Sequence, residues 1–239
     1  MMSKNIRTAF LLGAGLGTRL KPLTNDLPKP LLPLNGQPII THVFERLALV
    51  GIERFIVNTH HRASEYPRHF PHGSWRGIPI TFVPEEVLLD TAGGLKNIEP
   101  FIKDEEDILI HNADIVSSLP LNILLDKHLA GNALATLALR SQGHLLNVAL
   151  SPTGFVTDIR GALNTGTKKL YQFTGVYIVQ RALLEHIPAG KVESIVDTFI
   201  RIIRQQTQAV AGVVIDTGYW NDLGTLEQYQ RICKEFANE

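Results

Sequence analysis

The sequence is poor in cysteine and has no excess of charge of either sign. Among its 239 residues it holds one cysteine, Cys233, which excludes an intramolecular disulfide framework and a zinc site built from cysteines. Its 23 Lys and Arg residues balance its 23 Asp and Glu residues, and they form no basic stripe. Because a nucleic-acid-binding protein usually carries a basic excess, we expect no nucleic-acid partner.

Long apolar runs and repeats are missing as well. The apolar stretch 9–16 is too short to cross a bilayer, and it lacks the cleavage pattern of a signal peptide. There is no hexapeptide pattern of a left-handed β-helix, so we expect no appended domain of that kind. We therefore expect a cytoplasmic protein without membrane contact. Its 239 residues and 44% hydrophobic content are enough for one large α/β domain, or at most two small ones.

A glycine-rich turn follows the first apolar run of the chain. The run 8–12 predicts a short strand, and Gly13, Gly15 and Gly17 come directly after it. Glycines at the end of a strand let backbone N–H groups approach an anion without a Cβ in the way. The spacing matches neither the P-loop nor the dinucleotide-binding pattern, because Thr18 stands where the latter needs its third glycine. From the glycines alone, a tight turn without a ligand stays open.

The elements after this turn predict a parallel sheet. Apolar residues recur at helical spacing from 38 to 50, Gly51 ends that pattern, and 54–58 is a buried strand. Strand, helix and strand at this spacing form a βαβ unit with a right-handed crossover. We predict an α/β fold with a Rossmann-like mixed, mostly parallel sheet and helices on both faces. Further strands are expected at 78–83, 108–111, 133–139, 172–179 and 210–214, a hairpin at 148–159, and helices at 119–129, 181–187, 195–206 and 225–237.

Two polar features lie at the ends of predicted strands. Adjacent side chains on a strand point apart, so His60 and His61 rarely share one metal ion, and a polar loop is the favoured interpretation. Asp114 follows the apolar strand 108–111. Ligands of open α/β sheets lie beyond the carboxyl ends of strands, where a carboxylate can hold Mg²⁺ against phosphates. A helix cap is the competing role for a single aspartate.

The glycine turn and the residues after it resemble the N-terminal signature of the sugar-1-phosphate nucleotidyltransferases, also called NDP-sugar pyrophosphorylases. The matching residues are Gly15-Leu16-Gly17-Thr18-Arg19-Leu20-Lys21-Pro22-Leu23-Thr24 and Pro28-Lys29-Pro30-Leu31. Three later segments resemble further family motifs: 90–94 (DTAGG), 172–177 (QFTGVY) and 220–225 (WNDLGT). The resemblance implies one catalytic domain, 1–239, with a nucleotide-binding half at about 1–115 and a sugar-binding half at about 116–239.

The resemblance also implies roles for individual residues. It implies that Arg19 and Lys29 are catalytic, with Arg19 on the leaving pyrophosphate and Lys29 between the α-phosphate and the sugar phosphate. Asp114 and Asp222 would hold Mg²⁺, the implied cofactor. The nucleotide is expected at Leu12, Gly13, Ala14, Gly15, Gly17, Thr18, Glu85, Thr91, Gly93 and Gly94, and the sugar at Asn112, Thr174 and Gly175.

The sequence departs from the family pattern in the sugar-binding half. Many relatives carry an E-K-P motif after the hairpin, and this chain has 160–169 (RGALNTGTKK) there instead. Lys168 or Lys169 could replace the missing lysine, although we favour solvated charges. A smaller departure lies in the nucleotide-binding half, where Asn112-Ala113-Asp114 has Ala113 in place of the family's glycine before the aspartate. This change affects the turn more than the carboxylate.

The implied reaction transfers a nucleotidyl group from an NTP to a sugar 1-phosphate, giving an NDP-sugar and pyrophosphate. Guanine offers two N–H groups on one edge, which suits a carboxylate such as Glu85 or Glu86. This favours GTP, with mannose 1-phosphate or a related hexose or heptose 1-phosphate as the acceptor. A UTP-dependent N-acetylmuramate 1-phosphate uridylyltransferase and a non-catalytic nucleotide-sugar-binding protein stay as alternatives. We expect a monomer or a small homo-oligomer.

Overall fold

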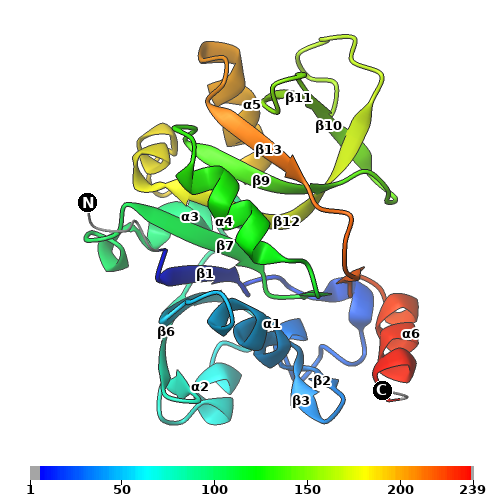
Figure 1. Cartoon of the computed structure of the whole chain (residues 1–239). Coiled ribbons are helices and arrows are strands. Elements are labelled where there is room, and N and C mark those ends of the chain that lie inside the picture. Colours follow the sequence, from blue (N-terminus) through cyan, green and yellow to red (C-terminus); the bar gives the residue numbers. More distant parts are fainter. Residues whose placement is uncertain (1–5, 238–239) are drawn as a thin grey trace. The chain divides into compact units, whose positions relative to one another are not determined.

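The computed structural model describes residues 6–237, which form two compact units (Figure 1). The first unit contains Arg7–Leu88, His111–Ser118 and the chain from Tyr219 onward. The second unit contains Leu89–Ile110 and Leu119–Gly218. The chain thus leaves the first unit and returns to it twice, so the two units interleave along the sequence. The division into a nucleotide-binding half and a sugar-binding half at about residue 115 stays a prediction.

The first unit contains the predicted βαβ arrangement. Strands β1 (Thr8–Leu12), β4 (Arg54–Thr59) and β6 (Ile78–Pro84) are parallel neighbours in the order β1-β4-β6. Helix α1 (Ile39–Ala48) connects β1 to β4 and buries its apolar face. Gly51 takes the left-handed conformation after it, with φ 90°, as expected of a residue that ends a helix. The strand-helix-strand prediction is confirmed.

Short elements complete the first unit. Strands β8 (Ile115–Ser117) and β14 (Trp220–Asp222) form an antiparallel pair. Helix α6 (Leu226–Phe236) packs with β8 into a small apolar core that includes Val116, Leu223 and Ile232. This pair therefore joins two distant parts of the sequence within the first unit. The remaining bounds are η1 (Thr18–Leu20), η2 (Lys29–Leu31), β2 (Pro33–Leu34), β3 (Gln37–Pro38), α2 (Glu65–His69) and β5 (Ser74–Trp75).

The second unit is built on the long strand β12 (Leu170–Gln180). It pairs antiparallel with β9 (Ala135–Arg140) and β10 (Leu146–Leu150) and also neighbours β7 (Asp107–Asn112), while β13 (Val210–Val214) runs parallel to β9. The sheet is therefore mixed, and the predicted α/β class is confirmed. The remaining bounds are α3 (Asp90–Asn97), η3 (Glu99–Phe101), α4 (Leu121–Leu129), β11 (Val156–Ile159), η4 (Arg181–His186) and α5 (Ile195–Gln205).

Most elements of the second unit match the sequence prediction, and one differs in its type of helix. The segment expected as a helix at 181–187 is the 3-10 helix η4. Helix α3 begins at Asp90, whose φ is 60°, and its N-cap position is Leu89, which makes no side-chain cap.

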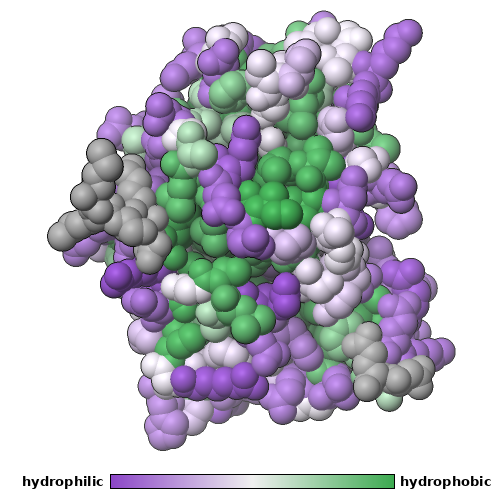
Figure 2. All heavy atoms as spheres, viewed as in Figure 1, coloured by the Kyte–Doolittle hydropathy of each residue, from purple (hydrophilic) through white to green (hydrophobic). Residues whose placement is uncertain are grey.

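Figure 2 shows the surface in the view of Figure 1, where apolar side chains gather over β9 and β13. No helix within 6–237 is long and apolar enough to cross a membrane.

Candidate functional site

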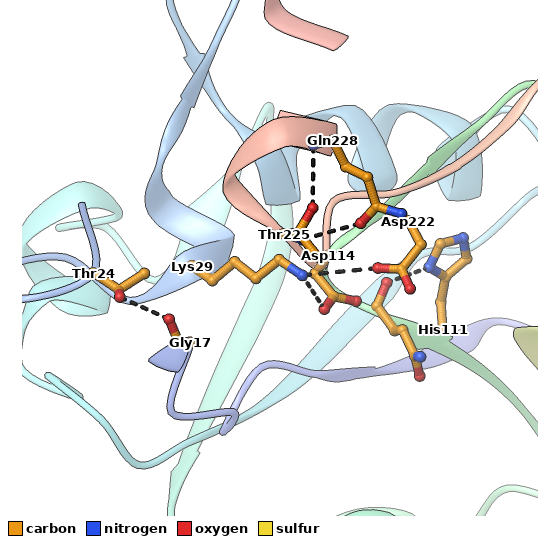
Figure 3. Close-up of polar contacts among 9 residues, drawn as sticks. Gly17, Thr24, Lys29, His111, Asp114, Asp222, Thr225 and Gln228 are labelled. Atoms are coloured by element: carbon orange, nitrogen blue, oxygen red, sulfur yellow. Dashed lines mark hydrogen bonds and ion pairs between the residues drawn. The ribbon is translucent and has the colours of Figure 1, made fainter. Parts of the chain in front are cut away.

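The glycine turn leaves the end of β1 and leads into η1 in the first unit. Gly17 precedes η1 in the left-handed conformation, with φ 62°. A Cβ there would lie 2.8 Å from the Cγ2 of Thr24, so glycine is required by both conformation and space. The Thr24 hydroxyl donates to the Gly17 carbonyl at 2.8 Å (Figure 3), and this bond fixes the C-terminal end of the turn.

Gly13, at the other end of the turn, has both of its backbone polar groups bonded to side chains. Its N–H donates to the Oδ1 of Asn58 at 2.8 Å, and its carbonyl accepts from the hydroxyl of Tyr66 at 3.0 Å. A Cβ on Gly13 would lie 2.9 Å from the Asn58 carbonyl oxygen. The turn is therefore held at both ends, and the backbone between them faces a cleft.

The cleft has a volume of about 300 Å³ and lies wholly within the first unit. Its walls come from the glycine turn, from η1 and η2, and from the region around Asp114 and Gly224. The lining residues are Leu12, Gly13, Gly15, Leu16, Gly17, Thr18, Arg19, Leu20, Lys29, Pro30, Leu88, Asp114 and Gly224. Of the predicted nucleotide-binding and catalytic residues, Leu12, Gly13, Gly15, Gly17, Thr18, Arg19 and Lys29 line it, whereas Ala14 is buried beside it.

The pairing of β8 with β14 brings the two predicted metal ligands together. Asp222 lies opposite Ile115 in this pair, one residue after Asp114. The N–H of Leu223 also donates to the Asp114 carbonyl at 3.2 Å. On the other side, the Ala113 N–H donates to the Leu12 carbonyl at 3.2 Å, which places the same loop beside the end of β1. Two residues 108 positions apart in sequence thus meet at the glycine turn.

Lys29 lies between the two aspartates. Its Nζ is 2.5 Å from the Oδ2 of Asp114 and 3.9 Å from the Oδ1 of Asp222. Figure 3 shows the lysine pointing at both carboxylates. Only 7% of the Lys29 side chain is exposed, because η2 packs it against the core. Removing an ammonium group from water is costly unless carboxylates compensate it. The lysine and the aspartates therefore stabilise one another at one point.

The pKa of the Asp222 carboxyl is raised by its surroundings, which include a second carboxylate. Burial raises the pKa of the Asp222 carboxyl, and the nearby Asp114 raises it further. Lys29, Arg19 and the backbone N–H of Gly224 act in the opposite direction. Two neighbouring carboxylates, with one pKa raised by the other, form a site that would gain from a second cation.

The donor set fits a magnesium ion. Mg²⁺ prefers oxygen ligands and commonly takes one or two carboxylates from the protein and the rest from phosphates and water. Asp114 and Asp222 converge on one point beside the glycine turn, which meets that requirement. Within 6–237 no cluster of three or more His, Cys, Asp and Glu side chains is arranged to hold a metal ion. Binding of Mg²⁺ stays a prediction.

Glu85 lies at the end of β6 and is 5% exposed. Its Oε1 accepts from the Nδ2 of Asn58 at 2.7 Å, and its backbone N–H donates to the Thr59 carbonyl at 2.7 Å. Glu85 does not line the cleft around the turn. Its role in reading the base stays a prediction, and its observed contact connects it to Gly13 through Asn58.

The two adjacent histidines bond to different backbone carbonyl groups. The Nδ1 of His60 lies 2.8 Å from the carbonyl oxygen of Glu85, and the Nε2 of His61 lies 2.6 Å from that of Thr24. Their rings therefore reach in different directions, as the alternation of side chains along a strand predicts. The segment from Asn58 to His61 therefore contacts both ends of the glycine turn, through Asn58 at Gly13 and through His61 at Thr24.

The other predicted nucleotide-binding residues belong to the second unit. The Thr91 hydroxyl accepts from the Ile195 N–H at 2.8 Å. Gly93 is buried, and a Cβ on it would lie 2.4 Å from the Lys191 carbonyl oxygen. Gly94 is buried in the same helix, α3. These contacts give Thr91 and Gly93 packing roles, and their contact with a nucleotide stays a prediction.

The predicted sugar-binding residues fall in both units. In the second unit, the buried Thr174 hydroxyl donates to the Ala138 carbonyl at 2.8 Å, and Gly175 has a φ of 75°. Asn112 belongs to the first unit and accepts from the His111 ring through its backbone carbonyl. Lys168 and Lys169 are both exposed, and the Lys169 Nζ lies 5.5 Å from the centroid of the Tyr171 ring. Their sugar-binding roles stay predictions.

Sequence reasoning missed three residues that shape the site. Tyr66 lies on α2, in a polar segment with no periodic signal that could have singled it out. Thr24 was part of the matched signature but carried no role of its own. Asn58 had a detectable signal, because a buried polar residue at the end of an apolar strand needs a partner.

The chain matches the nucleotidyl transferase family over residues 8–144, and it belongs to that family. It is 32% identical over 228 residues to a mannose-1-phosphate guanylyltransferase from Mycobacterium tuberculosis, a match that covers 93% of this chain and 62% of the relative. It is 26% identical over 242 residues to a D-glycero-α-D-manno-heptose 1-phosphate guanylyltransferase from Aneurinibacillus thermoaerophilus, covering 96% and 98%. This chain thus spans less than two thirds of the first relative and nearly the whole length of the second.

A solved structure supports the same assignment of the fold. HddC from Yersinia pseudotuberculosis superimposes with a TM-score of 0.78 at 21% identity, covering 97% of this chain and 100% of that one. At that identity the likeness shows the shared fold. The expected fold of nucleotide-diphospho-sugar transferases is therefore confirmed.

Proposed function

We propose that the chain catalyses Mg²⁺-dependent transfer of a nucleotidyl group from an NTP to a sugar 1-phosphate, releasing pyrophosphate. The observation that carries the proposal is the position of Lys29 between Asp114 and Asp222, beside the glycine turn. Lys29, Asp114 and the backbone of the glycine turn line one cleft, and Asp222 lies next to it on the other side of Lys29. A buried lysine, two carboxylates and a glycine-rich turn at this place suit a polyanionic substrate with a metal ion.

The chemistry requires charge neutralisation more than proton transfer. The attacking group is a phosphate oxygen that is already an anion, so no general base is needed. Two unit charges about 4 Å apart repel by roughly 4 kcal/mol at an effective dielectric near 20, and the two substrates carry several such charges. The protein's task is therefore to hold both phosphates in line and to neutralise them.

Each group in the cleft has a proposed part in this task. Backbone N–H groups from Ala14 to Gly17 hold the triphosphate, whereas the Gly13 N–H is bonded to Asn58 and anchors the turn. Arg19 contacts the pyrophosphate that leaves. Lys29 contacts the α-phosphate and the incoming sugar phosphate. Asp114 and Asp222 hold Mg²⁺, which supplies charge neutralisation at the phosphates when bound.

We propose GTP as the nucleotide and mannose 1-phosphate, or a related hexose or heptose 1-phosphate, as the acceptor. The names of two relatives, guanylyltransferases for mannose 1-phosphate and for a heptose 1-phosphate, support this choice. A carboxylate such as Glu85 suits the two N–H groups on the guanine edge. A UTP-dependent transfer to N-acetylmuramate 1-phosphate is the second candidate within the same reaction class. Cytoplasmic location and the oligomeric state stay predictions.

A matrix of five NTPs against several sugar 1-phosphates, read as released pyrophosphate, tests the proposal. We expect one pair, GTP with mannose 1-phosphate or a heptose 1-phosphate, to exceed the others. Asp114→Asn and Asp222→Asn should each abolish release while circular dichroism stays unchanged, and Asp126→Asn on the exposed face of α4 serves as the control. Absence of product in every well would favour a non-catalytic nucleotide-sugar-binding protein. Full activity of either site variant would overturn the metal assignment.

A further inference from the structure

Two hydrogen bonds connect Glu85 to the first glycine of the turn, and a third holds that glycine from another side chain. The Asn58 carboxamide lies between them, with its Nδ2 donating to Glu85 and its Oδ1 accepting from the Gly13 N–H. The Tyr66 hydroxyl completes the set by donating to the Gly13 carbonyl. All three side chains are buried, with exposed fractions of 3% for Asn58, 5% for Glu85 and below 1% for Tyr66.

The orientation of the Asn58 amide follows from its partners. A backbone N–H can only donate, so the atom of Asn58 that faces Gly13 must be the oxygen. The NH₂ group then faces Glu85, whose carboxylate is an acceptor. Only an asparagine side chain offers an acceptor and a donor at this reach, because aspartate lacks the donor and leucine lacks both.

The bonds to Gly13 constrain the turn. Both polar groups of this residue are taken, and a Cβ would collide with the Asn58 carbonyl, the Tyr66 hydroxyl and Val57. Gly13 is therefore held between β4 and α2 with little freedom. The backbone that follows, up to Gly17, forms one wall of the cleft. The direction of its N–H groups depends on where this first residue is held.

We infer that Asn58 is a positioning residue for the phosphate-binding turn and couples it to Glu85. The inference rests on the proposed function, since it assumes that the turn holds the triphosphate of an NTP. Asn58 does not line the cleft. It acts through Gly13, whose placement decides whether the N–H groups of the turn meet the phosphates.

Kinetics of Asn58→Ala test the inference. We expect KM for the NTP to rise about tenfold or more and kcat to fall, because misplacing a binding group by about 1 Å can cost up to about a hundredfold. KM for the sugar 1-phosphate should stay within about twofold, a split that general loss of structure would not produce. Asn122→Ala on the exposed face of α4 is the matched control and should behave as the wild type.

The Asn58→Asp variant separates the bond to Gly13 from the bond to Glu85. Its carboxyl keeps an acceptor for the Gly13 N–H but places a second carboxylate against Glu85. Two neighbouring carboxylates repel each other, and the bond to Glu85 is lost. We therefore expect the NTP KM of Asn58→Asp to rise about as far as that of Asn58→Ala if the coupling to Glu85 positions the turn. A wild-type NTP KM in Asn58→Asp would overturn the coupling to Glu85 and leave the bond to Gly13 as sufficient.

Titration with a fluorescent GTP analogue in the absence of a sugar phosphate keeps the inference testable apart from catalysis. Weaker binding by Asn58→Ala and by Tyr66→Phe, each with a retained thermal transition, supports it. Wild-type affinity and wild-type NTP KM in both variants would overturn it. If the wild type releases no pyrophosphate with any substrate pair, the proposed reaction fails, but the binding measurement still decides on Asn58. If Asn58→Ala does not fold, Tyr66→Phe and Asn58→Asp carry the test.

Discussion

The ammonium group of Lys29 lies 2.5 Å from the carboxylate of Asp114, at the place where the two proposed metal ligands converge. A cation of the protein thus neutralises the carboxylates. When a metal ion binds there, it meets a lysine that already compensates the same charges. The phosphates of a nucleotide offer Lys29 another partner. The metal and the nucleotide should therefore favour each other's binding.

Lys29→Gln should bind a divalent cation more tightly than the wild type when no nucleotide is present. Removal of the ammonium leaves Asp114 and Asp222 without their nearest counter-charge, so the gain from a metal ion increases. Electron paramagnetic resonance of free Mn²⁺ measures the affinity, and Mg²⁺ should also raise the melting temperature of the variant more than that of the wild type. Transfer activity should fall by orders of magnitude. Equal or weaker Mn²⁺ binding by the variant would show that Lys29 does not compete with the metal.

Three glycine variants should separate conformation from close approach to the ligand. Gly17→Ala should lower stability by about 1–2 kcal/mol and weaken NTP binding, because Gly17 is left-handed and faces Thr24. Gly15→Ala should leave stability unchanged, since no atom lies within 4 Å of its Cβ position, and should weaken NTP binding alone. Thermal unfolding and nucleotide titration measure the two effects.

Gly36→Ala provides the third member of the series. Gly36 has a φ of 74°, and no atom lies within 4 Å of its Cβ position. It lies between β2 and β3, outside the cleft. Gly36→Ala should therefore lose stability without any change in nucleotide affinity. Unchanged nucleotide affinity in Gly15→Ala would contradict a close approach of phosphates to the turn.

In the reverse reaction, Arg19→Lys should raise KM for pyrophosphate more than KM for the NDP-sugar. Arg19 is exposed and lines the cleft. Its guanidinium can bind two phosphate oxygens at once, whereas a lysine offers a point charge. We expect KM for pyrophosphate to rise about tenfold with KM for the NDP-sugar little changed. Pyrophosphorolysis kinetics measure both values. Arg7→Lys, which changes an exposed ion pair with Glu53, is the control. A rise confined to the NDP-sugar KM would place Arg19 elsewhere on the substrate.

The sequence predicted the elements around the turn because their signals are local. The apolar period of α1, the run of β4 and the glycines after β1 each lie within a few residues, and the predicted elements agree with the observed ones. The β8–β14 pair could not be predicted in this way. Each strand has three residues, which is too short for a period, and they meet across more than a hundred residues. Only the family resemblance suggested that Asp114 and Asp222 share a site.

The side chains that contact the turn could not be predicted from the sequence either, because they lie far from the turn along the chain. Nothing near Tyr66 in the sequence indicates that its hydroxyl reaches Gly13, 53 positions earlier. The bonds of His60 and His61 to distant carbonyl groups are equally invisible, although their divergence was expected from strand geometry. Residues that contact ligands follow recognisable motifs, whereas the residues that hold those motifs in place depend on tertiary packing.

Acid should destabilise the protein through His111, which is 1% exposed beside the Asp114 loop. Burial lowers the pKa of His111 from 6.5 to about 4, and its Nδ1 donates to the Asn112 carbonyl at 2.7 Å. The unfolded chain therefore takes up this proton at a higher pH than the folded protein does. Stability from the neutral ring is fully present above pH 6.5 and is lost as the pH falls toward 4. A shift of this size corresponds to roughly 3 kcal/mol in all.

His111→Asn should remove this dependence, because an asparagine keeps an N–H donor and does not titrate. We expect the melting temperature of the wild type to decrease more than that of the variant as the pH is lowered from about 6.5 to about 4.5. Both are measured without nucleotide or metal. His144→Asn, which changes an exposed histidine, should follow the wild type at every pH. Parallel curves for wild type and His111→Asn would mean that the ring is protonated in the folded protein as easily as in the unfolded chain, and that its burial carries no electrostatic cost.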